Sequence, residues 1–392
     1  MQFASALSHE TQTEAAVTEV LEMVARRLSE KPVHLSFVFA SPHHLKTFHS
    51  FLPVIQERFA THTLLGCTGG GVIGDRREIE NQPGLALLAA HLPGVTISPF
   101  HIEQSELAAE RPDTDWQQRL SMSPAVEPAF ALLADPFTID VQKLLEKFNN
   151  AFPERTVLGG LASGGQSPDS CALFLNGEVL HGAVGVALKG NFILRTVVSQ
   201  GCKPIGQPQV ITRGDGQIIY ELGGRQALVV VRETLAALSA EDRALAQTAL
   251  LMGRVIDEYK ADFSRGDFLI RTLMGADPNS GAIAVGDRLR SGQTVQLHVR
   301  DAATAREDLQ ALIGALAPEL AERPAHGALV FSCNGRGAHL YGEPDYDSRV
   351  IAATTGAIPT AGFFCNGEIG PIGHDNFLHG FTASVGIFQE KD

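Results

Sequence analysis

The sequence has few cysteines, and none of them belongs to a recognisable pair. Its 392 residues include five, at Cys67, Cys171, Cys202, Cys333 and Cys365. Their number is odd and no two form a C-x-x-C pair, whereas disulfide frameworks and structural zinc sites depend on such spacings. We therefore expect reduced thiols and no metal site.

Positive charge and long apolar runs are scarce as well. The chain has 31 Lys and Arg against 44 Asp and Glu, a net charge of -13, whereas a nucleic-acid surface needs clustered basic residues. The longest apolar stretches, such as PGLALLAAHLPGV, are too short to span a bilayer. The first residues lack the basic start and apolar core of a secretory signal. We therefore expect a cytoplasmic protein with no nucleic-acid or membrane partner.

A nucleotide-binding motif is also absent. The segment LLGCTGGGVIG (64–74) is rich in glycine, but no Lys followed by Ser or Thr comes after its last glycine, as a phosphate-binding P-loop requires. A dinucleotide fingerprint needs a helix directly after the glycines, whereas a strand is expected here. We therefore expect no cofactor, although Thr68 in this loop is a candidate ligand contact.

One pattern is present three times along the chain. Each copy has an apolar strand, a helix, a second strand that ends in glycines, and a strand pair. The first strands of the copies are VHLSFVFA (33–40), AFALLADP (129–136) and GALVFSCNGRG (327–337). The glycine-rich strands are LLGCTGGGVIG (64–74), VLGGLASGGQ (157–166) and TAGFFCNGEIG (360–370).

The register of the glycines supports a structural duplication. Four residues of the first copy align without a gap with four of the third, and the middle copy keeps the first glycine spacing. The aligned positions are Gly66, Gly71, Ile73 and Gly74 with Gly362, Gly367, Ile369 and Gly370, and Gly159 and Gly164 in the middle copy. A fourth, degenerate copy is expected within 265–302.

These elements predict an α/β fold of two halves, each a mixed sheet covered by helices and built from repeated strand–helix–strand–hairpin units. The apolar runs LSFVFA, FALLA and ALVF are typical of strands buried on both faces. The stretch 201–218 is rich in Gly and Pro and is the expected join. We place the first domain at 1–205 and the second at 206–392.

The candidate site lies at two strand ends near the C-terminus. Cys333-Asn334 and Cys365-Asn366 are each followed by glycine, directly after a buried strand. If both strands belong to one sheet, their ends share a crevice of the kind in which α/β proteins bind ligands. The alternative is structural, because Asn-Gly is common in tight turns and cysteine is often a small buried residue.

Two charged residues complete this candidate site. Arg336 offers a forked donor for a carboxylate and Glu368 an acceptor for an amine, which together suit a zwitterion such as an amino acid. The alternative is that such strand-end charges form ion pairs within the protein. Arg271, on the otherwise apolar strand FLIR (268–271), is either an edge charge or a second anion contact.

A cysteine-dependent enzyme is a less favoured interpretation. A nucleophilic cysteine needs a lowered pKa and a base within reach. His339, His374 and His379 are available in the sequence, but their spacing does not bring any of them to a thiol. We therefore expect no catalytic residues.

The sequence resembles the FIST family (F-box and intracellular signal transduction). The resemblance rests on LLGCTGGGVIG, REIENQPGLALLAAHLPGV and VLGGLASGG in the first half, and on FLIRTLMGADPNSGAIAVGD, GALVFSCNGRG and TAGFFCNGEIGP in the second. It implies a non-catalytic sensory domain that binds a small ligand, with a signalling protein as partner. A protein-interaction scaffold is the alternative, and strand pairs with few charges near the C-terminus leave room for a homodimer.

Overall fold

The computed structural model describes residues 1–29, 31–60, 63–108, 112–167 and 170–391. The chain divides into two units. The larger unit comprises Met1–Val198, Leu309–Leu378 and Thr382–Asp392, and the inserted unit comprises Ser199–Asp308 and His379–Phe381.

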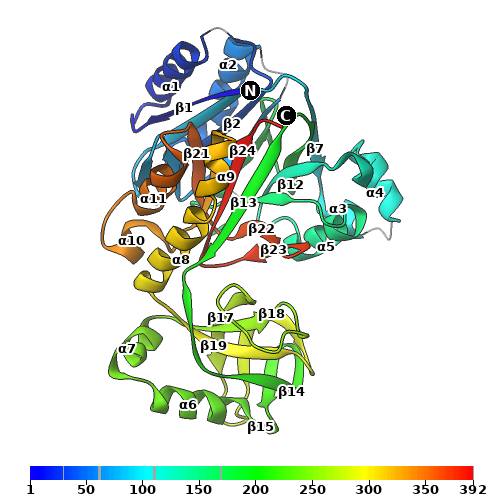
Figure 1. The fold of residues 1–392 in the computed structure, drawn as a ribbon, viewed down its shortest axis with the longest axis vertical. Coiled ribbons are helices and arrows are strands. Elements are labelled where there is room, and N and C mark those ends of the chain that lie inside the picture. Colours follow the sequence, from blue (N-terminus) through cyan, green and yellow to red (C-terminus); the bar gives the residue numbers. More distant parts are fainter. Residues whose placement is uncertain (30, 61–62, 109–111, 168–169, 392) are drawn as a thin grey trace. The chain divides into compact units, whose positions relative to one another are not determined.

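The larger unit contains the three predicted copies (Figure 1). Each begins with a strand, a helical segment and a second strand parallel to the first, followed by a hairpin and one or two further strands. The first copy has β2 (Leu35–Ala40), α2 (Phe48–Phe59), β3 (Leu64–Thr68), β4 (Gly71–Gly74), β5 (Arg77–Glu80), β6 (Leu85–His91) and β7 (Val95–Ile102). The second has β8 (Ala129–Ala134), α5 (Val141–Ala151), β9 (Val157–Leu161), β10 (Leu173–Leu175), β11 (Glu178–Leu180), β12 (Ala183–Gly190) and β13 (Ile193–Gln200). The third has β20 (Ala325–Cys333), α10 (Gly337–Tyr341), α11 (Tyr346–Thr355), β21 (Thr360–Cys365), β22 (Glu368–Ile372), β23 (Asp375–His379) and β24 (Thr382–Gln389).

Further elements of the chain lie before, within or between the copies. They are β1 (Gln2–Ser8), α1 (Thr13–Leu28), η1 (Pro42–Thr47), α3 (Gln104–Ala108), α4 (Asp113–Arg119), η2 (Pro124–Val126), α8 (Ala302–Gly314) and α9 (Ala317–Glu322). Among the residues that the structure describes, no helix has the length and apolar character needed to cross a membrane. The predicted α/β class, with mixed sheets and covering helices, is confirmed.

The aligned glycines have a structural cause. Gly66, Gly159 and Gly362 each lie opposite a residue of the parallel neighbouring strand, which is Val38, Leu132 and Val330 respectively. A Cβ atom at any of the three would lie 1.7 to 1.9 Å from the carbonyl oxygen of that neighbour. Because such atoms cannot approach within 3.0 Å, only glycine fits. The predicted duplication is therefore present in the structure.

Each copy donates its hairpin to the sheet of another copy. The hairpin β4–β5 of the first copy pairs with β21, β10–β11 of the second with β3, and β22–β23 of the third with β9. The result is three six-stranded sheets, β1-β6-β2-β3-β10-β11, β7-β12-β8-β9-β22-β23 and β13-β24-β20-β21-β4-β5. This exchange follows one cyclic order, so the three copies are related by a pseudo-threefold axis.

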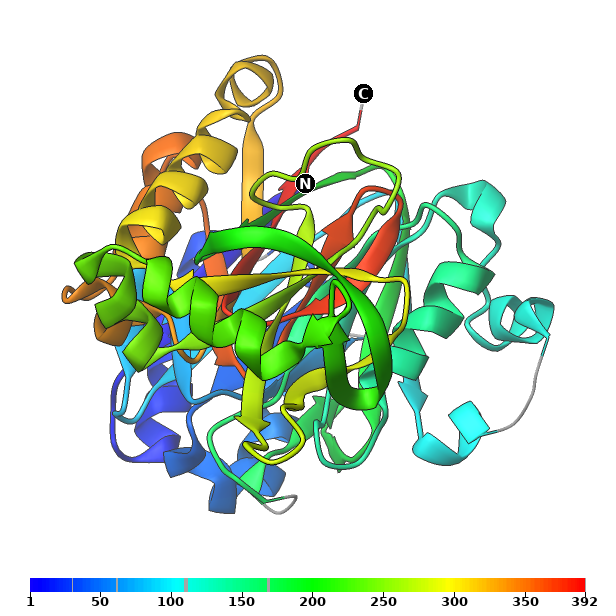
Figure 2. The same cartoon turned by 90° about the horizontal axis from the view of Figure 1, so that it is seen from below.

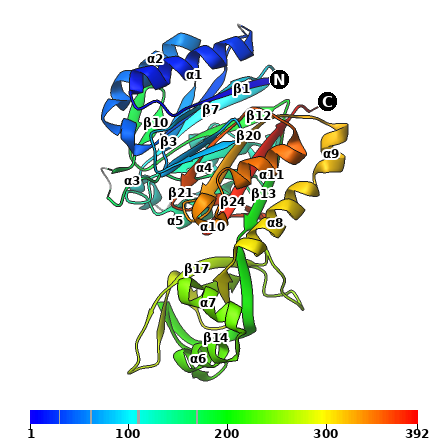
Figure 3. The same ribbon diagram turned by 90° about the vertical axis from the view of Figure 1, so that its left-hand side faces the viewer.

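The three sheets share one apolar core. Along each first strand, alternate residues point to this common core and the others to covering helices. Phe39 of the first sheet packs against Phe331 and Phe363 of the third, with ring centroids 6.3 and 5.1 Å apart. Helices α1 and α2 cover the outer face of the first sheet, α4 and α5 that of the second, and α8 and α11 that of the third (Figure 3).

The inserted unit has a different architecture. It contains β14 (Cys202–Leu222), β15 (Arg225–Gln226), α6 (Ala227–Ala237), α7 (Ala240–Thr248), β16 (Leu250–Val255), β17 (Phe268–Ala276), β18 (Ile283–Arg290) and β19 (Thr294–Arg300). The long, curved β14 pairs with both β18 and β19, which closes a ring of antiparallel strands (Figure 2). The expectation of a fourth copy within 265–302 is wrong, because tight turns join these strands directly and leave no crossover helix for a parallel pair.

Candidate functional site

Three loops of the larger unit meet where β3, β9 and β21 end. The Ser163 N–H donates to the carbonyl oxygen of Thr68 at 3.1 Å, and the Asn366 N–H donates to that of Leu161 at 3.2 Å. Each donor lies four residues after the aligned glycine of its own copy, Gly159 or Gly362. Each acceptor lies two residues after the aligned glycine of its copy, Gly66 or Gly159. The bonds are therefore equivalent under the pseudo-threefold relation.

The third link of this ring passes through a side chain. By symmetry, the Gly70 N–H is expected to bond the carbonyl oxygen of Phe364. Instead it donates to Ser163 Oγ at 2.8 Å, and Ser163 Oγ donates to Phe364. A buried serine hydroxyl, which both accepts and donates, thus closes the ring that the backbone leaves open.

An open cavity of about 530 Å³ lies over these loops. Its lining is mainly polar, with four amide side chains, one carboxylate and one imidazole. The lining residues are Gly70, Gly71, Glu80, Asn81, Gly164, Gly165, Gln166, Asn334, His339, Phe364 and Asn366. Such a hollow, with several convergent polar groups, is suited to a small ligand.

The two Asn-Gly motifs meet in this cavity. Both asparagine side chains are exposed, and Asn334 Nδ2 donates to Asn366 Oδ1 at 2.8 Å. A Cβ atom at Gly70 would lie 2.5 Å from Asn334 Oδ1, so the glycine leaves room for this pair. The structure therefore brings together Asn334 and Asn366 at the shared edge of β20 and β21, as the sequence led us to expect.

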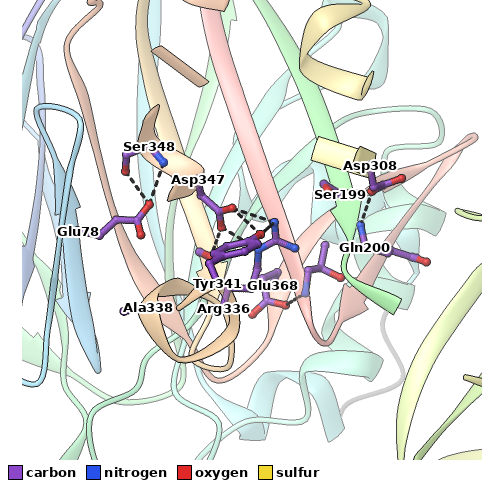
Figure 4. A network of polar contacts seen from close by, with 12 residues as sticks. Glu78, Ser199, Gln200, Asp308, Arg336, Ala338, Tyr341, Asp347, Ser348 and Glu368 are labelled. Carbon is purple, nitrogen blue, oxygen red and sulfur yellow. Dashed lines mark hydrogen bonds and ion pairs between the residues drawn. The ribbon is translucent and has the colours of Figure 1, made fainter. Parts of the chain in front are cut away.

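Arg336 does not reach the cavity. It is fully buried, and its Nε and Nη2 donate to the two carboxylate oxygens of Asp347 at 2.8 and 2.9 Å (Figure 4). The Tyr341 hydroxyl accepts from Arg336 Nη2 at 2.6 Å and donates to Asp347 at 2.8 Å. Nε and Nη2 of the guanidinium are thus engaged within the protein and the side chain does not line the cavity, so the interpretation of Arg336 as a carboxylate anchor there is wrong.

Glu368 is also buried away from the cavity. Its Oε2 accepts from the N–H of Thr382 at 3.2 Å. Burial raises the pKa of Glu368 well above its usual range, although the nearby charge of Arg336 acts in the opposite direction. An enclosed side chain that does not line the cavity cannot meet the amine of a ligand there, so this second predicted anchor is wrong as well.

The remaining predicted contacts are placed elsewhere. Thr68 is buried, and its hydroxyl accepts from the N–H of Ala172 at 3.0 Å. Cys365 is buried, and burial raises the pKa of its thiol, which disfavours a thiolate there. Cys333 is half-buried and does not line the cavity. Arg271 lies in the inserted unit, where it and Arg254 both pair with Asp287.

Glu80 is a lining residue that sequence reasoning missed. It lies at the end of β5, and its Oε1 accepts from the Ala338 N–H of α10 at 2.8 Å. The strand is short and partly polar, and nothing in its sequence indicates that it pairs within another sheet. Two other loops of the site could have been found from the sequence. The glycine-rich segments GGG (69–71) of the first copy and ASGG (162–165) of the second stand out there, and both loops line the cavity.

Glu78, two residues earlier, makes stability depend on pH. It accepts from Ser348 N and Oγ at 2.8 and 2.9 Å, and burial together with the charge of Asp347 raises its pKa from 4.5 to about 8. The folded state therefore holds a proton that the unfolded chain releases, and stability falls as pH rises from about 5 to 8. We expect Glu78→Gln to be more stable than wild type by about 3 kcal/mol at pH 7 and to have a flatter pH profile in urea unfolding. Parallel pH profiles of the two proteins would contradict this expectation.

Two family models and several known proteins match most of the chain. The model of the FIST N domain matches residues 34–225, and that of the FIST C domain matches 227–371. An uncharacterized protein of Mycobacterium tuberculosis is 39% identical over 358 residues, which are 91% of each chain. An uncharacterized protein of Mycobacterium bovis is 37% identical over 376 residues, 96% of this chain and 95% of its own. The two family models meet inside the inserted unit, whereas the boundary that we predicted at 205/206 lies earlier, within β14.

Proposed function

Since the chain belongs to the FIST family, whose domains are sensory domains of signal transduction, we propose that it is a non-catalytic cytoplasmic sensor. Its small-molecule ligand binds in the cavity above the ring of hydrogen bonds that Ser163 closes, and a signalling protein receives the response. The observation that carries the proposal is the meeting of Asn334 and Asn366 with the glycine loops of the other two copies around one polar hollow.

We propose that the ligand is an amino acid. Residues other than Arg336 and Glu368 then bind it. Asparagine and glutamine side chains both donate and accept hydrogen bonds, so Asn334, Asn366 and Gln166 match the mixed polarity of an amino acid. The glycines beside them allow a ligand to approach the backbone closely. Phe364 adds an apolar patch for a side chain.

A thermal-shift screen against amino acids, small carboxylates and nucleotides tests this proposal. A ligand that binds only the folded state raises the unfolding midpoint by mass action. We expect a rise with amino acids in the wild type and its loss in Asn366→Ala. Because this variant also loses the hydrogen bonds of Asn366 with Asn334 and with the Ala162 carbonyl, its shift is measured from its own ligand-free midpoint.

Gln118→Ala is the matched control, because Gln118 is an exposed amide of α4 that does not line the cavity. It should keep the full ligand response. If no compound shifts the wild-type midpoint, the sensor proposal fails and a protein-interaction scaffold becomes the better account.

A further inference from the structure

Resting on the proposed function, we infer that the cavity selects its ligand by a positively charged nitrogen, which Glu80 binds. The ligand class is therefore amines, including amino acids that bind through their ammonium end. A ligand that offers only a carboxylate should be rejected.

The charges around the cavity support a cationic ligand. Among the described lining residues, Glu80 is the single carboxylate and His339 the single imidazole, and neither Lys nor Arg is present. Arg336, which follows the lining residue Asn334 by only two positions, is fully buried and already paired with Asp347. A bound carboxylate would thus meet one negative group and no fixed cation, whereas an ammonium would complete a charge-assisted hydrogen bond.

The geometry of Glu80 leaves it able to accept a ligand. One carboxylate oxygen, Oε1, accepts from Ala338, and in the described part of the chain Oε2 accepts no further hydrogen bond. Burial raises the pKa of Glu80 and the carboxylates of Asp345 and Asp347 add to the rise, whereas the hydrogen bond from Ala338 and the imidazole of His339 lower it. The two neighbouring carboxylates repel the negative charge of Glu80, so a cation at Oε2 would offset this repulsion.

The amides supply the neutral part of the recognition. Asn81 follows Glu80 directly, and Gln166, Asn334 and Asn366 line the same hollow from three other loops. Amides tolerate a donor or an acceptor equally, so they do not require a free carboxylate on the ligand. Modification of the carboxyl end should therefore be tolerated, and modification of the amine should not.

Calorimetric titration of the full chain with four kinds of probe tests this inference. The probes are common amino acids, their amides, their N-acetyl derivatives, and the simple amines ethanolamine and putrescine. We expect free amino acids and amides to bind alike, and N-acetylation to weaken binding by about tenfold or more, as expected for loss of a hydrogen bond to a charged group.

Glu80→Gln separates the charge from the fold, because glutamine keeps an acceptor for the Ala338 N–H. It should lose binding by a similar factor, whereas Glu146→Gln, an exposed change in α5 away from the cavity, should not. N-acetyl forms binding as tightly as free amines, or an unchanged affinity of Glu80→Gln, would overturn the inference and leave the sensor proposal standing. Failure of all these probes and of the carboxylates to bind wild type would overturn both.

Discussion

Alanine at Gly159 is expected to prevent the larger unit from folding. The new Cβ atom would lie 1.7 Å from the carbonyl oxygen of Leu132, in the parallel neighbour β8. The clash is with backbone at the centre of a six-stranded sheet, so it cannot be relieved by turning a side chain. The strands must separate, which breaks hydrogen bonds and opens the packed core. We expect a loss of more than about 4 kcal/mol, beyond the usual range for one substitution.

The equivalent glycines should behave in the same way. Gly66→Ala and Gly362→Ala place a Cβ atom 1.9 and 1.7 Å from the carbonyl oxygens of Val38 and Val330. If the three copies are equivalent, the three losses should be similar, because each variant opens one of three related sheets.

Gly314→Ala is the matched control. Gly314 is exposed at the end of α8, its added Cβ would meet no atom within 4 Å, and alanine favours a helix by up to about 1 kcal/mol over glycine. Urea unfolding followed by circular dichroism compares the variants. If Gly159→Ala proved as stable as Gly314→Ala, the sheet would be able to widen. The close approach of β8 and β9 at this position would then not be required.

These glycines also explain why the repeat was readable in the sequence. A position that only glycine can occupy has glycine in every copy, so Gly66, Gly159 and Gly362 mark the repeat although most other positions differ. The exchange of hairpins was not readable. Each hairpin follows its own strand directly in the chain, and nothing local indicates that it pairs with another copy. Such long-range pairing depends on how three sheets share one core.

The candidate site was likewise predictable only in part. Strand ends in one parallel pair must lie together, so the meeting of Asn334 and Asn366 follows from the fold. Burial was not predictable from the motif. The direction of Arg336 depends on a carboxylate eleven residues later, Asp347, at the start of a helix whose packing the motif does not specify. The same limit hid Glu80, because β5 reaches the site only through the exchange of hairpins.

Removal of the Asp347 carboxylate is the second change with a large expected effect. Asp347 is almost fully buried and receives hydrogen bonds from Arg336, Tyr341 and the Ser332 hydroxyl. Asp347→Ala would leave the enclosed Arg336 guanidinium charged and without its ion-pair partner. Arginine cannot give up its proton, so it must be hydrated or the structure must open. We expect a loss of about 3–5 kcal/mol in urea unfolding.

A double variant distinguishes the stranded charge from the lost contacts. Arg336→Met with Asp347→Leu removes both charges and keeps an apolar filling, so it should be more stable than Asp347→Ala alone. Neither side chain lines the cavity, and a folded double variant should therefore still bind amino acids with the affinity of wild type. Loss of binding in a stably folded double variant would return Arg336 to the ligand site, and the buried ion pair would then have to open when the ligand enters.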